Sequence, residues 1–463
     1  MKKGSSIMLR LLTTPHEGRA KDGSLSTAAR LAAVGRVVGS RVAGRNRWRL
    51  SVVLLGMMFA RGRRTVTTWL RAVGILHDFA DYYYFLQPLG RKANELAERL
   101  FTLLLVRLVH GERVLLAVDD SPTKRYGPKV QGAGIHHNPT PGPADQKFLY
   151  GHIWVTIALL LRHPLWHTIG LPLLGLLYVR AQDIAQIPRK HGWRFRTKLV
   201  LAAQAVLRLA WLVKQAGKTV WAAADGAYAK RAFLIPLRAA KVIVVSRLRK
   251  DAALRTVPVP PKTKRRGRPR IYGQQRIHLA RRAAHPLGWQ QVECLVYGRL
   301  VTKTIKTFLA TWRPAGGLIR VVIVKEEHGC EYFFCTDPEA TPREIIETFA
   351  DRAAVEQDFH DVKEVWGAGQ QQVRNIWTNV AVFNLNLWVQ TLVECWAWHK
   401  PAEEIRDRHD SPWDDPDRRP SHADRRKALR RQILRHEYSS LSTAHRLSSK
   451  IRSLYESLLQ LAA

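Results

Sequence analysis

Acidic residues at three distant places in the chain are candidates for one catalytic site. Asp119 and Asp120 end the apolar run AVDD, and Asp225 ends the run TVWAAAD. The third position is Glu356. Carboxylates are ligands that Mg²⁺ and Mn²⁺ prefer, and a few of them suffice because Mg²⁺ keeps several of its waters. Two such ions at one site can cleave a phosphodiester, so we expect two Mg²⁺ or Mn²⁺ ions and a phosphodiester substrate.

Glu356 belongs to the spacing Phe349-x2-Arg352-x3-Glu356-x6-Lys363. On a continuous helix of about 3.6 residues per turn, these residues and His360 fall on one face. That face would place the Glu356 carboxylate on a metal while its cations, Arg352, His360 and Lys363, reach DNA phosphates. The alternative is an ordinary surface pair between Arg352 and Glu356, which would stabilise the helix only slightly.

The charge of the chain indicates a polyanionic partner. Among 463 residues, 75 are Lys or Arg and 37 are Asp or Glu, which gives a formal net charge of +38. Such an excess favours DNA or RNA over a membrane surface, because neutralising phosphates releases condensed counterions. The segment KRRGRPRIYG resembles an AT-hook, in which Arg266 and Arg268 would enter an A·T-rich minor groove. A solvated basic loop is the alternative for that segment.

Apolar periodicity divides the chain into parts of different secondary structure. The first part is helical and includes SLSTAARLAAVGRVVGSRV and KANELAERLFTLLLVRLVH. A β-β-β-α-β-α order follows, and the next part alternates like antiparallel strands. We therefore predict an α/β fold with these boundaries: a helical N-terminal DNA-binding domain at 1–110, a first core part at 111–239, a β-rich insertion at 240–340, a second core part at 341–400, and a C-terminal loop and helix at 401–463.

Capping residues in the sequence predict the starts of two helices, one in the first domain and one that carries Glu356. Thr65 or Thr67 would cap a basic helix in the first domain. TPREIIETFADRAAVEQDFHDVKEVW is predicted to be one long helix, with Thr341 as N-cap, Pro342 at its first position and Glu344 completing a capping box. The polar, Pro-containing segment at 400–426 is predicted to be an exposed loop, followed by a final helix from about 424 to 462.

Cysteine usage and hydropathy favour a cytoplasmic protein. None of the 4 cysteines forms a CxxC pair, so we expect reduced thiols and no zinc ribbon. The most apolar region, 153–179, is interrupted by Arg, His and Pro residues, and we expect no transmembrane helix and no membrane partner.

These motifs together resemble a known family over roughly residues 112–395. The spacing around Glu356 is similar to the Tyr–Arg–Glu–Lys signature of bacterial DDE transposases of the insertion-sequence 4/701-like group. VDDSPTKRYGPKVQGAGIHH and AAADGAYAKRAFL resemble the first and second aspartate segments of that group. The resemblance implies an RNase H-like mixed sheet flanked by helices, with a β-rich insertion before the last catalytic helix.

The resemblance also implies roles for individual residues. Glu356 and Asp225 match metal-binding acids, and Arg352 and Lys363 match cations that contact DNA phosphates. For the first acid, the Asp-x-Ser pattern favours Asp119 over Asp120, because strand alternation lets only one of them face the site.

Phe349 stands where the signature has Tyr, so the aromatic ring remains and a phosphate-binding hydroxyl is lost.

The function implied by the resemblance is DNA transposition. Such an enzyme cuts the ends of an insertion sequence at its terminal inverted repeats and joins them to target DNA, usually as a synaptic dimer in the bacterial cytoplasm at the nucleoid. Two alternatives stay open: a nuclease of the same fold that does not join DNA, and a DNA-binding protein that has lost its chemistry.

Overall fold

The computed structural model describes residues 46–138, 146–259, 267, 269–407, 413–415 and 417–441. Arg266, Arg268 and the helix expected over SLSTAARLAAVGRVVGSRV lie outside these residues. The chain forms two compact units: unit 1 comprises 1–100, 123–133 and 359–463, and unit 2 comprises 101–122 and 134–358. Within the described ranges, no helix is long and apolar enough to cross a membrane.

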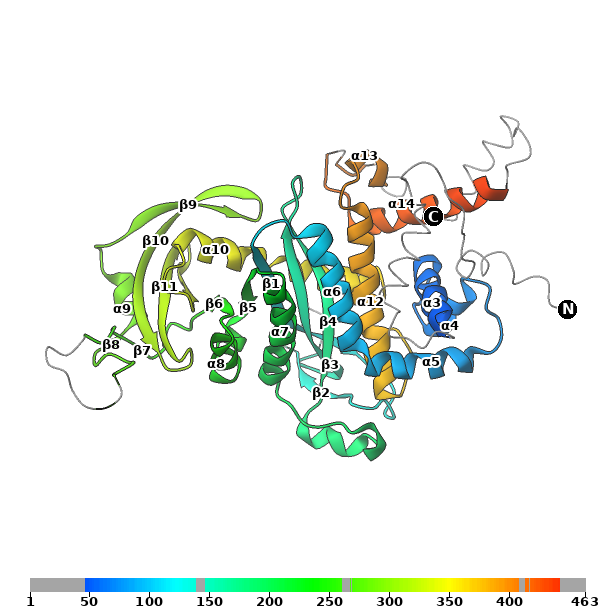
Figure 1. Ribbon diagram of the computed structural model, residues 1–463, viewed down its shortest axis with the longest axis horizontal. Helices are drawn as coiled ribbons and strands as arrows, with labels where there is room; N and C mark the ends of the chain where they lie inside the picture. The colour runs from blue at the N-terminus through cyan, green and yellow to red at the C-terminus, as the bar shows by residue number, and fades with distance from the viewer. Residues whose placement is uncertain are drawn as a thin grey trace. The chain divides into compact units, whose positions relative to one another are not determined.

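Unit 2 is built on a 12-stranded mixed sheet (Figure 1). Its first five long strands lie in the order β4-β3-β1-β5-β6. Strands β5 and β6 run parallel to β1, whereas β4 is antiparallel to β3. The bounds are β1 Arg113–Lys124, β3 Phe148–Arg162, β4 Thr168–Tyr178, β5 Thr219–Ala224 and β6 Ile243–Arg247.

We expected three strands before the first core helix, but one further short strand is present there. The segment GIHH forms β2 (Gly134–His137), which pairs antiparallel with the start of β3. Four residues carry too little periodicity to distinguish a strand from a loop, and only the neighbouring strand edge provides the hydrogen bonds that define β2.

The segment after β6 forms antiparallel strands, as the alternating pattern predicted, and these strands continue the same sheet. Strand β12 pairs antiparallel with β6, β11 with β12, and β10 with β11. Strand β9 and the short pair β7 and β8 complete the sheet on the far side of β10. Their bounds are β7 Leu254–Arg255, β8 Arg276–Ile277, β9 Gln290–Val296, β10 Arg299–Trp312, β11 Gly317–Glu326 and β12 Gly329–Cys335; the short helix α9 (Leu279–Ala284) lies between β8 and β9.

Helices pack on the sheet of unit 2 through apolar faces. Helix α7 (Lys198–Gln215), capped by Thr197, contacts β3, β4 and β5, and α8 (Arg231–Ala239) contacts α7 and β6. Helix α10 (Pro342–Asp351) contacts β5, β6, β9 and β12. Ile345 and Ile346 of α10 join Trp221 and Val245 of the sheet in one buried core. Short 3-10 turns occupy Ala181–Gln186, Arg189–His191 and Gly226–Tyr228.

The single long helix expected over 341–366 is instead two helices, α10 and α11 (Ala354–Glu364). The N-terminal prediction is confirmed: Thr341 caps α10, Pro342 lies in its first turn, and Glu344 completes the capping box. At the break, the amides of Val355 and Glu356 donate to the carbonyls three residues earlier. This tighter 3-10 pattern holds fewer residues per turn than an α-helix, so arithmetic for one continuous helix does not apply across it.

Most of the described secondary structure of unit 1 is helical (Figure 1). Helix α12 packs against α3, α5 and α14. Gly90 permits the close approach of α5, because a Cβ there would lie 1.8 Å from the Trp377 carbonyl oxygen. Thr65, and not Thr67, caps α4. The bounds are α3 Arg47–Phe59, α4 Val66–Arg71, α5 Phe79–Arg91, α6 Ala93–Leu108, α12 Ile376–Ala397, α13 Ala402–Ile405 and α14 His422–Leu441, with α6 continuing into unit 2.

The expectation of an exposed loop at 400–426 was partly wrong. Residues 402–405 form α13, and α14 begins at His422 with buried side chains. The buried Glu394 carboxylate of α12 accepts hydrogen bonds of 2.7 Å from Arg425 and contacts His422 at 2.6 Å. A buried charge requires such partners, which explains why polar residues here lie inside the unit.

Candidate active site

The two aspartate positions lie side by side because of the strand register. Parallel pairing matches Val118 of β1 with Ala224 of β5, so the next residues, Asp119 and Asp225, follow at the same level. Strand β5 ends at Ala224, and the Asp225 side chain accepts a hydrogen bond of 3.3 Å from the amide of Ala227. The parallel register thus brings two acids to the same level of the sheet, Asp225 just after the end of β5 and Asp119 within β1. The expectation that the first strand ends at its aspartates was wrong, because β1 continues to Lys124.

Arg352 links the first of these acids to Glu356. Its Nη1 donates to Asp119 Oδ2 at 2.7 Å, and its Nη2 donates to Glu356 Oε1 at 3.1 Å. The Arg352 side chain is 12% exposed and that of Asp119 is 20% exposed, whereas Glu356 is 64% exposed. The arginine therefore links Glu356 to Asp119, and its contact with Asp119 is the more sheltered of the two.

The Phe349 ring packs against the Arg352 guanidinium. The guanidinium carbon lies 5.2 Å from the centre of the Phe349 ring, within cation–π range. The ring also packs on Phe333 of β12, with 4.9 Å between ring centres. An aromatic ring at this position thus orients the arginine, and a hydroxyl is not needed for that contact.

The Asp119 carboxyl has an elevated pKa. Burial raises the pKa of Asp119 to about 6, although the Arg352 charge and the Asp120 amide oppose the rise. The negative charges of Asp120 and Asp225 raise it further. Asp119 consequently changes protonation state close to neutral pH, which is a common property of residues at functional sites.

Asp120 points to a different set of partners. Lys198 Nζ donates to Asp120 Oδ2 at 2.7 Å, and the buried hydroxyl of Tyr228 donates to Oδ1 at 2.9 Å. Burial and the neighbouring aspartates raise the pKa of Tyr228 well above its usual range, so it remains a donor. The two oxygens of Asp120 are therefore held by a lysine and a tyrosine, while Asp119 faces Arg352.

Lys198 and Tyr228 were not among the residues proposed from sequence. Tyr228 follows Asp225 by three residues, and the 3-10 turn that begins after Asp225 brings it back toward β1. Lys198 is the first residue of α7, where a positive charge opposes the helix dipole. A lysine in that unfavourable place was a usable sign of a nearby carboxylate.

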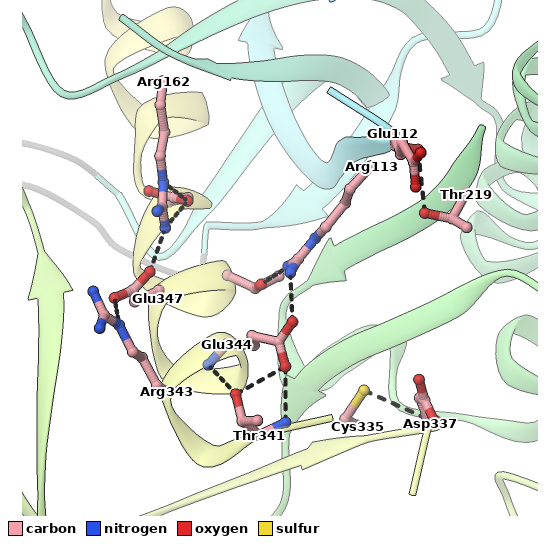
Figure 2. A network of polar contacts seen from close by, with 12 residues as sticks. Glu112, Arg113, Arg162, Thr219, Cys335, Asp337, Thr341, Arg343, Glu344 and Glu347 are labelled. Carbon is pink, nitrogen blue, oxygen red and sulfur yellow. Dashed lines mark hydrogen bonds and ion pairs between the residues drawn. The ribbon is translucent and has the colours of Figure 1, made fainter. Parts of the chain in front are cut away.

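Ion pairs fix helix α10, which leads to Arg352 and Glu356 (Figure 2). The buried Glu347 carboxylate accepts from the Leu295 amide at 2.9 Å, from Arg343 at 2.8 Å and from Arg162 at 2.9 Å. Arg162 also donates to Asp351, the last residue of α10, at 3.0 Å. These contacts hold α10, the helix that precedes Arg352 and Glu356 in the chain, to β3 and β9.

The N-terminal end of α10 is anchored separately. Arg113 of β1 pairs with Glu344 at 3.6 Å (Figure 2). Its guanidinium carbon lies 3.4 Å from the centre of the Trp221 ring. Because β1 also carries Asp119, this contact fixes the helix to the strand that provides the first acid. Both ends of α10 are thus tied to the sheet that holds the aspartates.

The acids as placed do not form a metal site. No group of three or more His, Cys, Asp or Glu side chains lies close enough to hold a metal ion, among the residues that the structure describes. The Arg352 guanidinium provides the positive charge between Asp119 and Glu356 instead. A divalent ion could bind between these carboxylates only if it replaced the Arg352 guanidinium.

The other residues proposed for DNA contacts lie elsewhere in the chain. His360 and Lys363 are on α11 after Glu356, in the part that belongs to unit 1. His360 is exposed and lies 3.3 Å from Asp361, and burial lowers the pKa of Lys363. The two AT-hook arginines are outside the described residues, so their role stays a prediction.

Comparison with known proteins identifies the family to which the chain belongs. A family model described as DDE superfamily endonuclease matches residues 42–314. The match contains Asp119 and Asp225 and ends before Glu356, so the role of Glu356 stays a prediction from sequence spacing. No curated protein matches the chain. The mixed α/β sheet flanked by helices is consistent with an RNase H-like DDE fold.

Proposed function

The chain belongs to the DDE superfamily endonucleases, and from that premise we propose that it is a DNA transposase. It would cut the terminal inverted repeats of an insertion sequence and join the freed ends to target DNA. The observation that carries the proposal is the strand register that brings Asp119 level with Asp225, with Glu356 linked to Asp119 through Arg352. DNA as substrate agrees with the family and with the net charge of +38.

Finer features of this proposal concern the fold and the signature. The strand order β4-β3-β1-β5-β6 supports an RNase H-like core, and strands β9–β12 would be its β-rich insertion. The helices of the first 110 residues would be a DNA-binding domain. Phe349, Arg352, Glu356 and Lys363 would form a variant Tyr–Arg–Glu–Lys signature of the insertion-sequence 4/701-like group.

The metal dependence of the enzyme is a further part of the proposal. DDE nucleases generally use divalent ions, and we propose two Mg²⁺ or Mn²⁺ ions with Asp119, Asp225 and Glu356 as their ligands. Such ions activate water and stabilise the phosphodiester transition state when bound. Because Arg352 bridges two of these acids, ion binding requires the guanidinium to leave Asp119. DNA phosphates are suitable new partners for it, since arginine pairs well with phosphate.

A joining assay separates the proposal from its rivals. Linear DNA carrying the element's own ends is incubated with a circular target plasmid, and new junctions are sequenced. A transposase gives junctions between the end and the plasmid, at the 3′ end of the donor strand. Cut DNA without junctions would indicate a nuclease of the same fold, and binding without cutting would indicate a protein that has lost its chemistry.

A further inference from the structure

The segment between β4 and α7 of unit 2 (Figure 1) is rich in exposed positive charge. We call residues 188–197, which read PRKHGWRFRT, the basic loop. It contains four cations, and all of them are exposed: Arg189, Lys190, Arg194 and Arg196. No Asp or Glu occurs in the sequence from 184 to 224, so no acid close in sequence neutralises the loop.

The basic loop leads directly to the candidate active site. Lys198 follows the loop as the first residue of α7, and its Nζ donates to Asp120 Oδ2 at 2.7 Å. Asp120 is the neighbour of Asp119, which the strand register brings level with Asp225. A molecule bound along the loop would therefore reach the acids that are proposed to cut DNA.

Contacts at both ends hold the basic loop in place. Before the loop, Arg180 pairs with Asp183 at 2.6 Å, and after it Lys198 pairs with Asp120 at 2.7 Å. His191 is buried within the loop, so the segment is anchored on its inner side. The carboxylates at the two ends thus have cationic partners of their own, while the cations of the loop itself are exposed to solvent.

An exposed aromatic ring lies among these cations. Phe195 stands between Arg194 and Arg196 in the sequence and is 47% exposed. Arg196 Nη1 donates to Gln204 Oε1 at 3.1 Å, which holds this side chain against α7. Proteins bind single-stranded nucleic acid by combining cations on the phosphates with aromatic rings stacked on the bases. Because base faces are covered in a duplex, the exposed ring favours an unpaired strand as the ligand.

We propose that the basic loop binds an unpaired DNA strand beside the candidate active site. Phe195 stacks on a base, and the arginines on either side of it pair with backbone phosphates. The strand then passes Lys198 and reaches Asp119 and Asp225. This inference rests on the proposed function in taking DNA as the ligand, but it concerns binding by one loop and not cleavage.

The test measures binding of the full-length protein to a labelled oligonucleotide of mixed sequence by fluorescence anisotropy. The oligonucleotide is used as a single strand and annealed to its complement, and EDTA is present so that no cleavage occurs. Phe195→Ala removes the ring, and Phe195→Trp keeps a ring that can stack. Because the side chain is exposed, both variants should fold, and circular dichroism melting checks that they do.

The expected result is a loss of affinity for the single strand only. Phe195→Ala should weaken single-strand binding about fivefold or more, since stacking on one base provides at least that factor. Phe195→Trp should bind the strand about as well as the wild type, and duplex affinity should not change in either variant. Unchanged single-strand affinity of Phe195→Ala, or an equal loss for strand and duplex, would overturn the proposal.

The charge of the loop is tested by the salt dependence of single-strand binding. Arg194→Gln removes one phosphate contact and should reduce the salt slope by about 0.7. Matched controls lie roughly 20 Å or more from Lys198 along the same helix. Trp211→Ala removes a ring that is 62% exposed, and Lys214→Gln removes an exposed charge. Both controls should bind like the wild type, and effects as large as those of the loop variants would contradict a site on the loop.

Binding to the loop and DNA joining are measured separately, so each proposal can fail without the other. A wild type that cuts and joins DNA, with Phe195→Ala binding the single strand normally, would support the transposase and overturn the role of the loop. Selective loss of single-strand binding by Phe195→Ala, in a protein that never cuts DNA, would support the loop and contradict the transposase.

Discussion

Replacing Arg352 by Gln tests how the candidate active site is held together. The side chain makes a sheltered contact with Asp119 at 2.7 Å and a more exposed one with Glu356 at 3.1 Å. A hydrogen bond to a charged group contributes about 1.5–3 kcal/mol when it is sheltered, whereas an exposed ion pair contributes less than about 1 kcal/mol. The Asp119 contact therefore dominates, and its strength depends on the ionisation of Asp119.

Because the contact is strong only when Asp119 is ionised, we expect the loss of stability to be larger at high pH than at low pH. The folded-state pKa of Asp119 is about 6, so its carboxylate is ionised at pH 8 and mostly protonated at pH 5. We expect Arg352→Gln to lower the free energy of unfolding by about 2 kcal/mol at pH 8 and by less than about 1 kcal/mol at pH 5. Urea denaturation at the two pH values measures both losses.

A control on the same segment separates this effect from general charge loss. Arg343 pairs with Glu347, and the pKa of Glu347 is lowered, so that carboxylate stays ionised at both pH values. Arg343→Gln should therefore give a similar, small loss at pH 5 and pH 8. An equal loss for Arg352→Gln at both pH values would refute the assignment of its main contact to Asp119.

The remaining predictions concern the acids and the helix that leads to them. Because burial raises the folded-state pKa of Asp119 from 3.8 to about 6, the wild type should lose more stability than Asp119→Asn as the pH rises between these values. Above pH 6, Asp119→Asn should be more stable than the wild type by up to about 3 kcal/mol in urea denaturation, and lower stability would contradict the pKa argument. In DNA cleavage, Asp119→Asn should remove activity, whereas Asp120→Asn, whose oxygens are occupied by Lys198 and Tyr228, should retain part of it; equal losses would mean that both acids serve the reaction directly. Thr341→Ala, which removes the capping box of α10, should cost about 1 kcal/mol and Thr341→Ser should cost less, as thermal unfolding will show.

The sequence predicted correctly those parts of the molecule in which the local pattern agrees with the tertiary structure. The two apolar runs that precede Asp119 and Asp225 became adjacent parallel strands, because a buried parallel strand is apolar on both faces. The first strand did not end at its aspartates but continues to Lys124. The capping box at Thr341 and Glu344 was readable because all of its partners lie within four residues.

Other parts depended on contacts that no local pattern records. No Pro or Gly stands at the break between α10 and α11, and periodicity alone predicted one helix. The contact of Arg352 with Asp119 joins residues 233 positions apart, so the spacing around Glu356 could not predict it. The polar segment that begins α14 was taken for a loop, because its buried partner Glu394 lies in another helix.

The most direct test of the central claim is cleavage of DNA that carries the element's flanking ends, by wild type and Glu356→Gln, with Mg²⁺ or with EDTA. We predict cutting by the wild type only with Mg²⁺ and none by Glu356→Gln, which should bind the same DNA with nearly unchanged affinity. Cutting in EDTA, or full activity of Glu356→Gln with Mg²⁺, would contradict a metal-dependent site built on these three acids.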